Sequence, residues 1–352
     1  MNTAPVKLFL APMEGVTDET FREVISGINL SPEINHLSLN FCVSEFIRVT
    51  TSLHPKRVFY RYVPELESLG RTRSGVPVLI QLLGGHAEPL AENAVRAIQL
   101  GAQGVDLNFG CPAKTVNRHD GGASLLKCPE RLYNIAKAVR QAMPLKNSVS
   151  AKIRLGVESP SLLFENVKAL EEAGVSWITV HCRTKDQGYR PPAHWEWIPR
   201  LKEISKTPFV VNGDIFTLDD FIRCQNATQA DAFMIGRGAL KNPFLFLQIR
   251  EYLTYGKSMS RPWPLTQQLV FDLHSMAEKK INAAFAAART KQWLKYLSLG
   301  FPEARFLFEN TKVYRAHDFS KKLRDPSAFE LALSNNSLHE KIKTDVHIKH
   351  YF

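Results

Sequence analysis

The chain has 352 residues, of which 44% are hydrophobic and 22% charged, enough to bury the core of one large domain and one smaller domain. Its apolar stretches fall short of the roughly 20 residues that cross a bilayer. Its first residues lack the blocks of a signal peptide, so we expect a cytoplasmic protein. The net charge of +11 favours a polyanionic partner, although a well-solvated basic surface would have the same composition.

Short apolar runs typical of β-strands alternate with helical patterns over the first two thirds of the chain. The predicted strands are Val6–Ala11, Leu37–Phe46, Val76–Leu83, Val105–Asn108, Val149–Arg154, Trp177–His181, Phe209–Asn212 and Ala232–Ile235. The helical patterns between them include Asp18–Ile28, Glu88–Leu100, Pro129–Met143, Ser161–Ala173 and Leu218–Cys224. This alternation predicts parallel strands joined by crossover helices. We predict an α/β fold, a closed (β/α)8 TIM barrel, with an open doubly wound sheet as the alternative.

After Asn242-Pro243 the strand signals stop and the pattern becomes helical. The predicted helices are Leu265–Phe285, Ala286–Leu299, Pro302–Ala316 and Ala328–Leu333. We therefore predict a barrel domain over residues 1–255, a smaller all-helical domain over residues 264–333, and a polar, partly disordered tail over residues 334–352. From Arg261 onward the chain carries 15 Lys and Arg against 9 Asp and Glu, so much of the excess charge lies in this part.

Glycine-bearing loops follow the seventh and eighth predicted strands, where barrels of this type commonly hold phosphate. The two loops are Asn212-Gly213-Asp214 and Gly236-Arg237-Gly238. Glycines let backbone N–H groups approach phosphate oxygens, and Arg237 adds a permanent cation. Either loop alone is explained by a tight turn, but the pair predicts a phosphate site.

Polar side chains interrupt several other predicted strands. Lys152 lies in a largely apolar strand, where it needs a negative charge, supplied either by an anionic ligand or by a structural ion pair. Gln81 and His181 offer further hydrogen bonds to a ligand, or are satisfied polar residues of the core. The turn Ala11-Pro12-Met13 offers a wall to a planar ring.

Cys111 follows the fourth predicted strand in the segment Asn108-Phe109-Gly110-Cys111-Pro112. A cysteine at this place is a nucleophile, a proton donor or a small buried apolar residue. The cysteines are odd in number and widely separated, with no Cys-x-x-Cys pair, so we expect reduced thiols and no metal site. They are Cys42, Cys111, Cys128, Cys182 and Cys224.

Motifs from about Leu8 to Pro243 resemble those of the flavin-dependent tRNA-dihydrouridine synthases. They are LAPMEGVTD, Ile80-Gln81-Leu82-Leu83-Gly84, DLNFGCPAKTV, GGASLL, AKIRLG, VHCRTKDQGY, VNGD and MIGRGAL. The resemblance implies an FMN-containing barrel that uses NADPH to reduce the C5–C6 double bond of uridines in the tRNA D-loop. Phe109 stands where Met or Cys is usual, and Cys182 where Gly is common, but neither change removes a functional group.

The resemblance also implies roles for individual residues. Cys111 would be the catalytic acid, and Asn108 would bind the edge of an extruded uridine. The loop from Ala113 to Leu126 would close over the base, with Lys114, Arg118 and His119 near phosphates. FMN would be held by Ala11, Pro12, Met13, Gln81, Lys152, His181, Asn212, Gly213, Asp214, Gly236 and Arg237.

Basic and aromatic residues in the helical part are candidates for tRNA contacts. Arg289, Trp293 and Tyr296 recur at i, i+4 and i+7, which places a cation and two aromatics on one helical face, although an aromatic at this spacing is often a core residue. The predicted tRNA contacts also include Arg48, Tyr189, Lys291 and Lys312.

Within the family, Glu45-Phe46-Ile47-Arg48, Arg289-Thr290-Lys291-Gln292-Trp293 and Lys312 are most similar to the bacterial subgroup that modifies position 16. The same chemistry at position 20 or 20a is an alternative. Two further alternatives are a dihydroorotate-dehydrogenase-like enzyme and a non-catalytic RNA-binding scaffold. We expect a monomer that binds tRNA and no membrane or metal.

Overall fold

The computed structural model describes residues 5–28, 38–118 and 120–324. These residues form two compact units. The first, the barrel unit, contains the chain up to Ala239 together with Leu245–Lys257. The second, the helical unit, contains Leu240–Phe244 and the chain from Ser258 onward. The short segment Leu240–Phe244 therefore groups with the C-terminal helices, which the sequence pattern did not predict.

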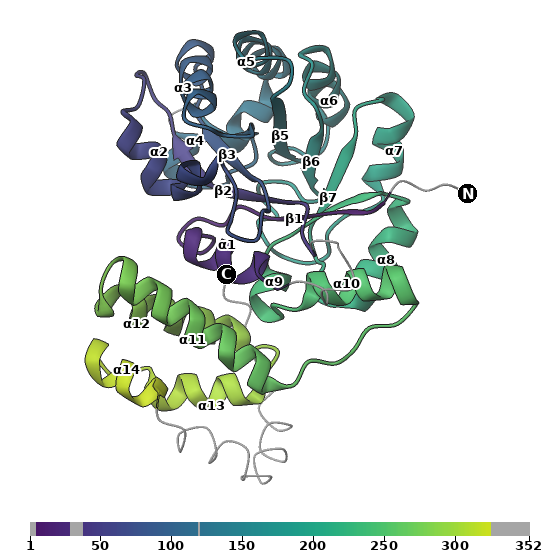
Figure 1. The fold of residues 1–352 in the computed structure, drawn as a ribbon. Coiled ribbons are helices and arrows are strands. Elements are labelled where there is room, and N and C mark those ends of the chain that lie inside the picture. Colours follow the sequence, from purple (N-terminus) through teal and green to yellow (C-terminus); the bar gives the residue numbers. More distant parts are fainter. Residues whose placement is uncertain (1–4, 29–37, 119, 325–352) are drawn as a thin grey trace. The chain divides into compact units, whose positions relative to one another are not determined.

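The barrel unit is a closed ring of parallel strands in sequence order, β1 to β8 (Figure 1), which confirms the predicted TIM barrel. Each strand pairs with its neighbour in sequence, and β8 pairs with β1. The strands are β1 Lys7–Leu10, β2 Phe41–Arg48, β3 Val78–Leu83, β4 Gly104–Asn108, β5 Ser148–Arg154, β6 Ile178–His181, β7 Phe209–Asn212 and β8 Ala232–Ile235. The predicted limits of β7 and β8 are those observed, because a continuous apolar run bounded by turn residues fixes both ends of a buried parallel strand.

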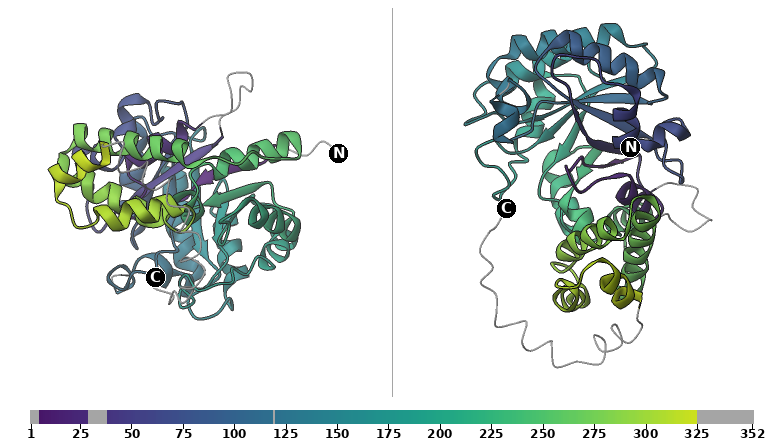
Figure 2. Two further views of the ribbon diagram at one scale, coloured as in Figure 1. Left: turned by 90° about the horizontal axis from the view of Figure 1, so that it is seen from below. Right: turned by 90° about the vertical axis from the view of Figure 1, so that its left-hand side faces the viewer.

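Helices lie outside this ring of strands, as Figures 1 and 2 show. They are α1 Glu19–Ser26, α2 Lys56–Tyr62, α3 Ala87–Gln99, α4 Lys114–Asn117, α5 Pro129–Ala142, α6 Leu163–Glu172, α7 Trp197–Ile204, α8 Leu218–Thr228, α9 Arg237–Lys241 and α10 Leu245–Tyr255, with 3-10 turns η1 Pro64–Ser68 and η2 Gly122–Lys127. The predicted helical patterns did not include α2, α7 and α10, nor the short helices α4 and α9. In α2 only Phe59 is fully buried, so a periodic apolar stripe is absent.

The interior of the barrel changes from aromatic to polar along the strands. Near the amino ends, the rings of Phe9 and Phe41 stack with 5.3 Å between their centroids, and Trp177 lies 6.0 Å from both. Aliphatic side chains of β2, β3, β7 and β8 pack around this group. Nearer the carboxyl ends, Gln81 and Asp106 occupy paired positions and are buried. The barrel is thus closed by apolar packing at one end and lined with polar groups at the other.

Four helices of the helical unit follow in order: α11 Trp263–Lys280, α12 Ala283–Leu297, α13 Pro302–Thr311 and α14 Ala316–Arg324. The predicted helix Leu265–Phe285 ends earlier, at Lys280, because Asn282 caps α12 by accepting a hydrogen bond from the Phe285 N–H at 2.8 Å. The predicted helix Pro302–Ala316 ends earlier, at Thr311, and a separate helix, α14, begins at Ala316. The predicted helix Ala328–Leu333 and the tail 334–352 lie outside the described residues.

A buried histidine joins three helices of this unit. His274 of α11 is hydrogen-bonded through Nδ1 to the Thr290 hydroxyl of α12 at 3.0 Å. Its Nε2 is bonded to the Ser320 hydroxyl of α14 at 2.9 Å. Both ring nitrogens are therefore satisfied inside the unit. Within the described ranges, no helix is both long enough and apolar enough to span a membrane.

Candidate active site

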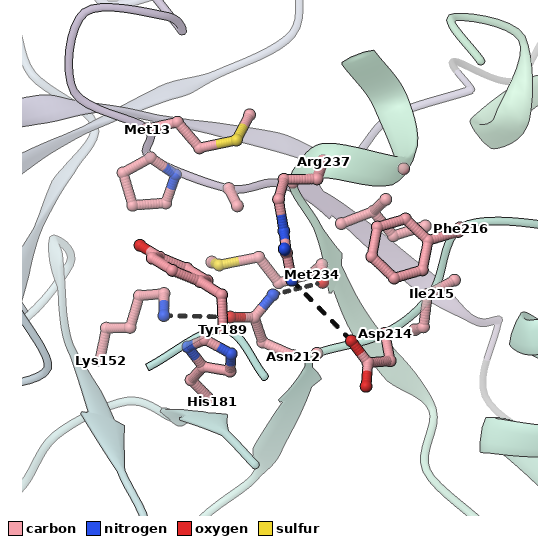
Figure 3. Close-up of a pocket in the computed structure, with 16 residues that line it drawn as sticks. Met13, Lys152, His181, Tyr189, Asn212, Asp214, Ile215, Phe216, Met234 and Arg237 are labelled. Atoms are coloured by element: carbon pink, nitrogen blue, oxygen red, sulfur yellow. Dashed lines mark hydrogen bonds and ion pairs between the residues drawn. The ribbon is translucent and has the colours of Figure 1, made fainter. Parts of the chain in front are cut away.

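A pocket opens at the carboxyl ends of the barrel strands (Figure 3), and we call it the cationic pocket. Every residue that the resemblance assigned to FMN lines it except Gln81. Tyr189, which was predicted to contact tRNA, lines it as well. The lining residues are Ala11, Pro12, Met13, Lys152, His181, Tyr189, Asn212, Gly213, Asp214, Ile215, Phe216, Met234, Ile235, Gly236, Arg237 and Gly238.

Lys152 reaches the cationic pocket from β5 and donates a hydrogen bond to Asn212 Oδ1 at 3.1 Å (Figure 3). The Asn212 amide is oriented by its own donation to the Met234 carbonyl at 2.8 Å. Burial of the ammonium group, followed by the nearby charge of Arg154, lowers the pKa of Lys152 to about 8. A bound anion would offset this loss. This is one of the two explanations that the sequence allowed for a lysine at this position, the other being a structural ion pair.

His181 is held as a neutral ring. Its Nε2 lies 3.2 Å from Nη1 of Arg183, and because a guanidinium only donates, Nε2 must accept and Nδ1 carries the hydrogen. Burial, and then the charges of Arg154 and Lys152, keep the pKa of His181 well below its usual value. The imidazole is therefore a hydrogen-bond donor without a charge at neutral pH.

Asp214 organises the loop after β7. Its carboxylate pairs with the buried Arg183 and accepts a hydrogen bond from the Ala193 N–H at 2.7 Å. Arg237 lies 3.9 Å from its other oxygen (Figure 3). The preceding residue, Gly213, has φ +126°, and a Cβ there would lie 2.9 Å from the Cβ of Ala193. Glycine is needed at this position for both reasons.

Tyr189 places an aromatic ring among the cations. Its ring lies 4.9 Å from the Arg237 guanidinium carbon, 5.4 Å from that of Arg154 and 6.0 Å from the His181 ring. The side chain is 43% exposed, so the ring is also accessible from outside the pocket. The two guanidinium contacts are cation–π interactions, and together with the ring contact to His181 they hold the loop after β6 over the site.

Cys111 lies beside the cationic pocket but does not line it. Its side chain packs with Leu83 and Val116 and is 9% exposed. Burial raises the pKa of the thiol, while the charges of Arg154 and Lys152 act in the opposite direction. Cys111 is therefore a protonated thiol at neutral pH, within the field of the pocket's cations.

The loop that follows Cys111 folds back onto it. The Cys111 carbonyl accepts hydrogen bonds from the Ala123 N–H at 3.1 Å and from Asn117 Nδ2 at 2.9 Å. Gly122 has φ +62°, and a Cβ there would lie 3.0 Å from the Cβ of Cys111. Gly122 is thus a point of close approach between this loop and the cysteine.

Gln81 and Asn108 are bonded to each other rather than lining the cationic pocket. Asn108 Nδ2 donates to Gln81 Oε1 at 2.8 Å, and Gln81 Nε2 donates to Asp106 at 2.7 Å. Gln81 therefore contacts Asp106 and Asn108 and does not line the cationic pocket. The assignment of Gln81 to FMN stays a prediction.

A second hollow lies at the ends of β2 and β3, next to the loop that carries Cys111. Arg48 and Arg118, which were predicted to meet RNA, line it together with His86. Both arginine side chains are exposed. Lys114 of the same loop is exposed too, whereas His119 lies outside the described residues.

The helical unit corrects part of the predicted tRNA contacts. Trp293 is fully buried, and its indole N–H donates to the Leu240 carbonyl at 3.1 Å, so its ring offers no face to a base. The prediction that Trp293 stacks on RNA is wrong. Arg289 is 5% exposed and donates to the Gln292 side chain at 2.7 Å. Its burial argues against the predicted contact between Arg289 and tRNA. The basic and aromatic face of α12 that carries Arg289 and Trp293 is therefore buried in the core.

The other predicted contacts of this unit have local partners. Lys291 donates to the Lys312 carbonyl at 3.1 Å and to the Tyr314 carbonyl, so it fixes the turn after α13. The Lys312 side chain pairs with Glu309. Tyr296 is half-buried. The remaining tRNA candidates, Arg48, Asn108 and Tyr189, belong to the barrel unit.

Several buried polar residues of the site escaped the sequence reading. Arg154 donates to the carbonyls of Gly110, Thr184 and Gly188, which ties the cysteine loop to the loop after β6. Arg183 orients His181, as described above. Their spacing could have identified them. Arg154 follows Lys152 by two residues, and Arg183 follows His181 by two, so in an extended segment each lies on the same face as the predicted site residue.

The closed barrel and the pocket at its strand ends together have the architecture of an α/β-barrel enzyme. A family model described as dihydrouridine synthase (Dus) matches residues 9–329. The chain therefore belongs to the dihydrouridine synthase family. As a member of this family it is a flavin-dependent oxidoreductase that acts on tRNA.

Curated relatives cover nearly the whole chain. A tRNA-dihydrouridine(16) synthase of Ralstonia nicotianae is 44% identical over 319 residues, 91% of this chain and 92% of the relative. A tRNA-dihydrouridine(16) synthase of Cupriavidus necator is 45% identical over 298 residues, 85% of this chain and 90% of the relative. Among solved structures, a 2-naphthoyl-CoA reductase complex has a TM-score of 0.53 at 13% identity, over 70% of this chain and 50% of that chain, which shows a shared fold.

Proposed function

We propose that the protein reduces the C5–C6 double bond of uridine 16 in the tRNA D-loop, with FMN as cofactor, NADPH as reductant and Cys111 as general acid. The observation that carries this proposal is the placement of the buried Cys111 thiol beside a pocket that Lys152 and Arg237 line. Two further arginines, Arg154 and Arg183, are buried next to residues of the pocket, and Asp214 pairs with Arg183.

The cationic pocket fits FMN at its phosphate end. Gly213 and Gly236 leave backbone N–H groups accessible, and Arg237 stands beside them. A Cβ at Gly236 would lie 3.2 Å from Met13 Sδ, so a larger residue would narrow this part of the pocket. Gly213, Gly236 and Arg237 would therefore hold the phosphate.

The opposite part of the pocket fits the flavin ring. Pro12 and Met13 provide an apolar wall, and Lys152 and His181 provide donors. Lys152 would stabilise negative charge on the pyrimidine edge of the ring, because its lowered pKa shows that the ammonium lacks a full counter-charge. Bound FMN would take up hydride from NADPH and supply it to C6 of the uridine.

Cys111 would deliver the proton that completes the reduction at C5. Its pKa is raised by burial, so the thiol keeps its proton at neutral pH and can donate it. Phe46 and Ala113 pack against the same apolar cluster, which limits the access of water to the thiol. The geometry therefore favours a proton donor over a thiolate nucleophile.

The substrate base must leave the RNA stack to reach this site, as base-modifying enzymes generally require. Asn108 is half-buried at the end of β4 and would bind the edge of the base. Tyr189 would line the entrance. Arg48 and Arg118 would meet phosphates on the other side of the cysteine loop.

Position 16 is supported by the relatives that share most of the chain. Those at 44% and 45% identity both bear the name tRNA-dihydrouridine(16) synthase. The family assignment also removes the dihydroorotate-dehydrogenase-like and the non-catalytic alternatives. Reduction at position 20 or 20a, the remaining alternative, would use the same chemistry on a different uridine.

The test is a single-turnover and steady-state assay with purified protein, NADPH and tRNA that lacks dihydrouridine. Mass spectrometry of nuclease fragments would locate the reduced base, and we expect it at position 16. A control reaction omits NADPH. Dihydrouridine at position 20 with uridine retained at 16 would refute the position, and no dihydrouridine in any tRNA would refute the function.

A further inference from the structure

A chain of hydrogen bonds runs from a buried carboxylate to the backbone next to the catalytic cysteine. Asp106 is 1% exposed and accepts from Ser150 Oγ at 2.6 Å and from Gln81 Nε2 at 2.7 Å. Gln81 Oε1 accepts from Asn108 Nδ2 at 2.8 Å. Asn108 Oδ1 accepts from the Gly110 N–H at 3.0 Å, one residue before Cys111.

The strand register explains why these side chains meet. Asp106 of β4 is paired with Gln81 of β3 on one side and with Ser150 of β5 on the other. Side chains at paired positions of neighbouring parallel strands point to the same face, which here is the barrel interior. Asn108 lies two residues beyond Asp106 on the same face. The chain of bonds therefore runs along β4 toward its carboxyl end and the cysteine loop.

The two ends of the chain permit only one orientation of both amides. A carboxylate accepts, so the Gln81 NH2 group must face Asp106 and its oxygen must face Asn108. A peptide N–H donates, so the Asn108 oxygen must face Gly110 and its NH2 group must face Gln81. One N–H hydrogen of Asn108 remains outside the chain of bonds.

We propose that Asp106 is a positioning residue that locks Gln81 and Asn108 so that Asn108 presents an N–H donor, and not its carbonyl, to a carbonyl oxygen of the reacting pyrimidine. Through the bond to Gly110, the same lock sets the position of the Cys111 loop. This inference deepens the proposed function and rests on it. Asp106 itself touches neither base nor cofactor in this scheme.

A merely structural or electrostatic role for Asp106 makes different predictions. If Asp106 served only as a counter-charge near Lys152, any neutral side chain would be equally harmful. If it served only to fill space, an apolar side chain of similar size would be tolerated. The locking role requires an acceptor for Gln81 but no charge, because Asn at position 106 can accept from Gln81 while its NH2 group donates to the Ser150 hydroxyl.

The experiment compares Asp106→Leu with Asp106→Asn in the FMN-loaded enzyme, with Ser150→Ala as the matched control that removes a bond to Asp106 outside the chain. NADPH-driven flavin bleaching and reoxidation by tRNA are measured separately in stopped flow. We expect Asp106→Leu to slow reoxidation by tRNA about 10- to 100-fold, since small misplacements of reacting groups have effects of this size. Bleaching should stay within about 3-fold, as should both steps in Asp106→Asn and Ser150→Ala.

Equal damage by Leu and Asn would show a charge effect, and full activity of a folded Asp106→Leu protein would show that the lock is dispensable; either outcome overturns the proposal. Where Asp106→Leu does not fold, hydrogen exchange of the Asn108 side-chain amide decides. For the Asn108 N–H that is bonded to Gln81, exchange should be slow in wild-type and Asp106→Asn protein and fast in Gln81→Met, and fast exchange of this hydrogen in wild type would also overturn the proposal. Because exchange needs no tRNA, it distinguishes failure of this inference from failure of the proposed function.

Discussion

The barrel mouth, formed by the carboxyl ends of the barrel strands, and the helical unit both bury polar and charged side chains, but for different purposes. In the barrel mouth, burial and then the charges of Arg154, Lys152 and Arg183 lower the pKa of His181. In the helical unit, buried polar groups such as His274 are matched bond for bond by hydroxyls of adjacent helices. Unbalanced charge indicates a ligand site, and balanced hydrogen bonding indicates a structural core.

The strongest test of this contrast is Cys111→Ala. Removing the proton donor should lower dihydrouridine formation about 100- to 10,000-fold, the range typical of general acid catalysis. Flavin bleaching by NADPH should remain near wild type, because hydride transfer to the flavin does not need this proton. Cys128→Ala, at a half-buried cysteine outside the apolar cluster of Cys111, is the control. Unchanged uridine reduction in Cys111→Ala would assign the proton to another group.

The next largest effect is expected in the helical unit and on stability alone. Trp293→Ala removes a fully buried ring and its hydrogen bond to Leu240, which should lower the free energy of unfolding by about 3–5 kcal/mol. Denaturant titration measures this change, and Leu299→Ala, at a 56% exposed side chain, is the control. If Trp293→Ala left stability intact but weakened tRNA binding, the assignment of this face to the core would fail.

A smaller effect is expected for Arg237→Ala in the barrel mouth. Loss of a charged donor to phosphate should weaken FMN binding by about 1.5–3 kcal/mol. Quenching of flavin fluorescence on titration of the apoprotein gives the dissociation constant. Arg223→Ala, which removes an exposed arginine paired with Asp220 on α8, is the matched control. Equal FMN affinity in both variants would place the phosphate elsewhere.

The smallest effect concerns pH and Lys152 in the apoprotein. The pKa of Lys152 is lowered to about 8 in the folded state, against an ordinary value near 10.5, so the unfolded state binds the proton more tightly. The free energy of unfolding should therefore rise with pH between about 8 and 10.5, with a slope from this group of at most about 1.4 kcal/mol per pH unit. Lys152→Met should show a shallower rise in denaturant titrations across this window. A parallel rise in both proteins would show that the ammonium is not destabilised by burial.

Sequence reasoning reached most of the barrel because its signals are local. Apolar runs bounded by turns fix buried parallel strands, and the eight strands in order leave few topologies. Most residues of the cationic pocket could also be predicted from local sequence signals. They sit at strand ends, and the closure of the barrel brings strand ends together.

The helical unit shows where this reasoning ended. The spacing of Arg289, Trp293 and Tyr296 defines one face of α12 but not what that face meets. Tertiary packing buries Trp293 and turns the basic and aromatic pattern inward. An amphipathic aromatic side chain fits a core and an RNA surface equally well, so periodicity cannot distinguish the two.

The order of strands, the placement of polar residues at their ends and the position of Cys111 were determined by the sequence, because each depends on residues close together in the chain. Only the tertiary structure decided how Asp106, Gln81 and Asn108 are linked and how Arg183 fixes the tautomer of His181. Those arrangements depend on the register between strands and on which donors and acceptors face each other across them. These relations arise only when the barrel closes.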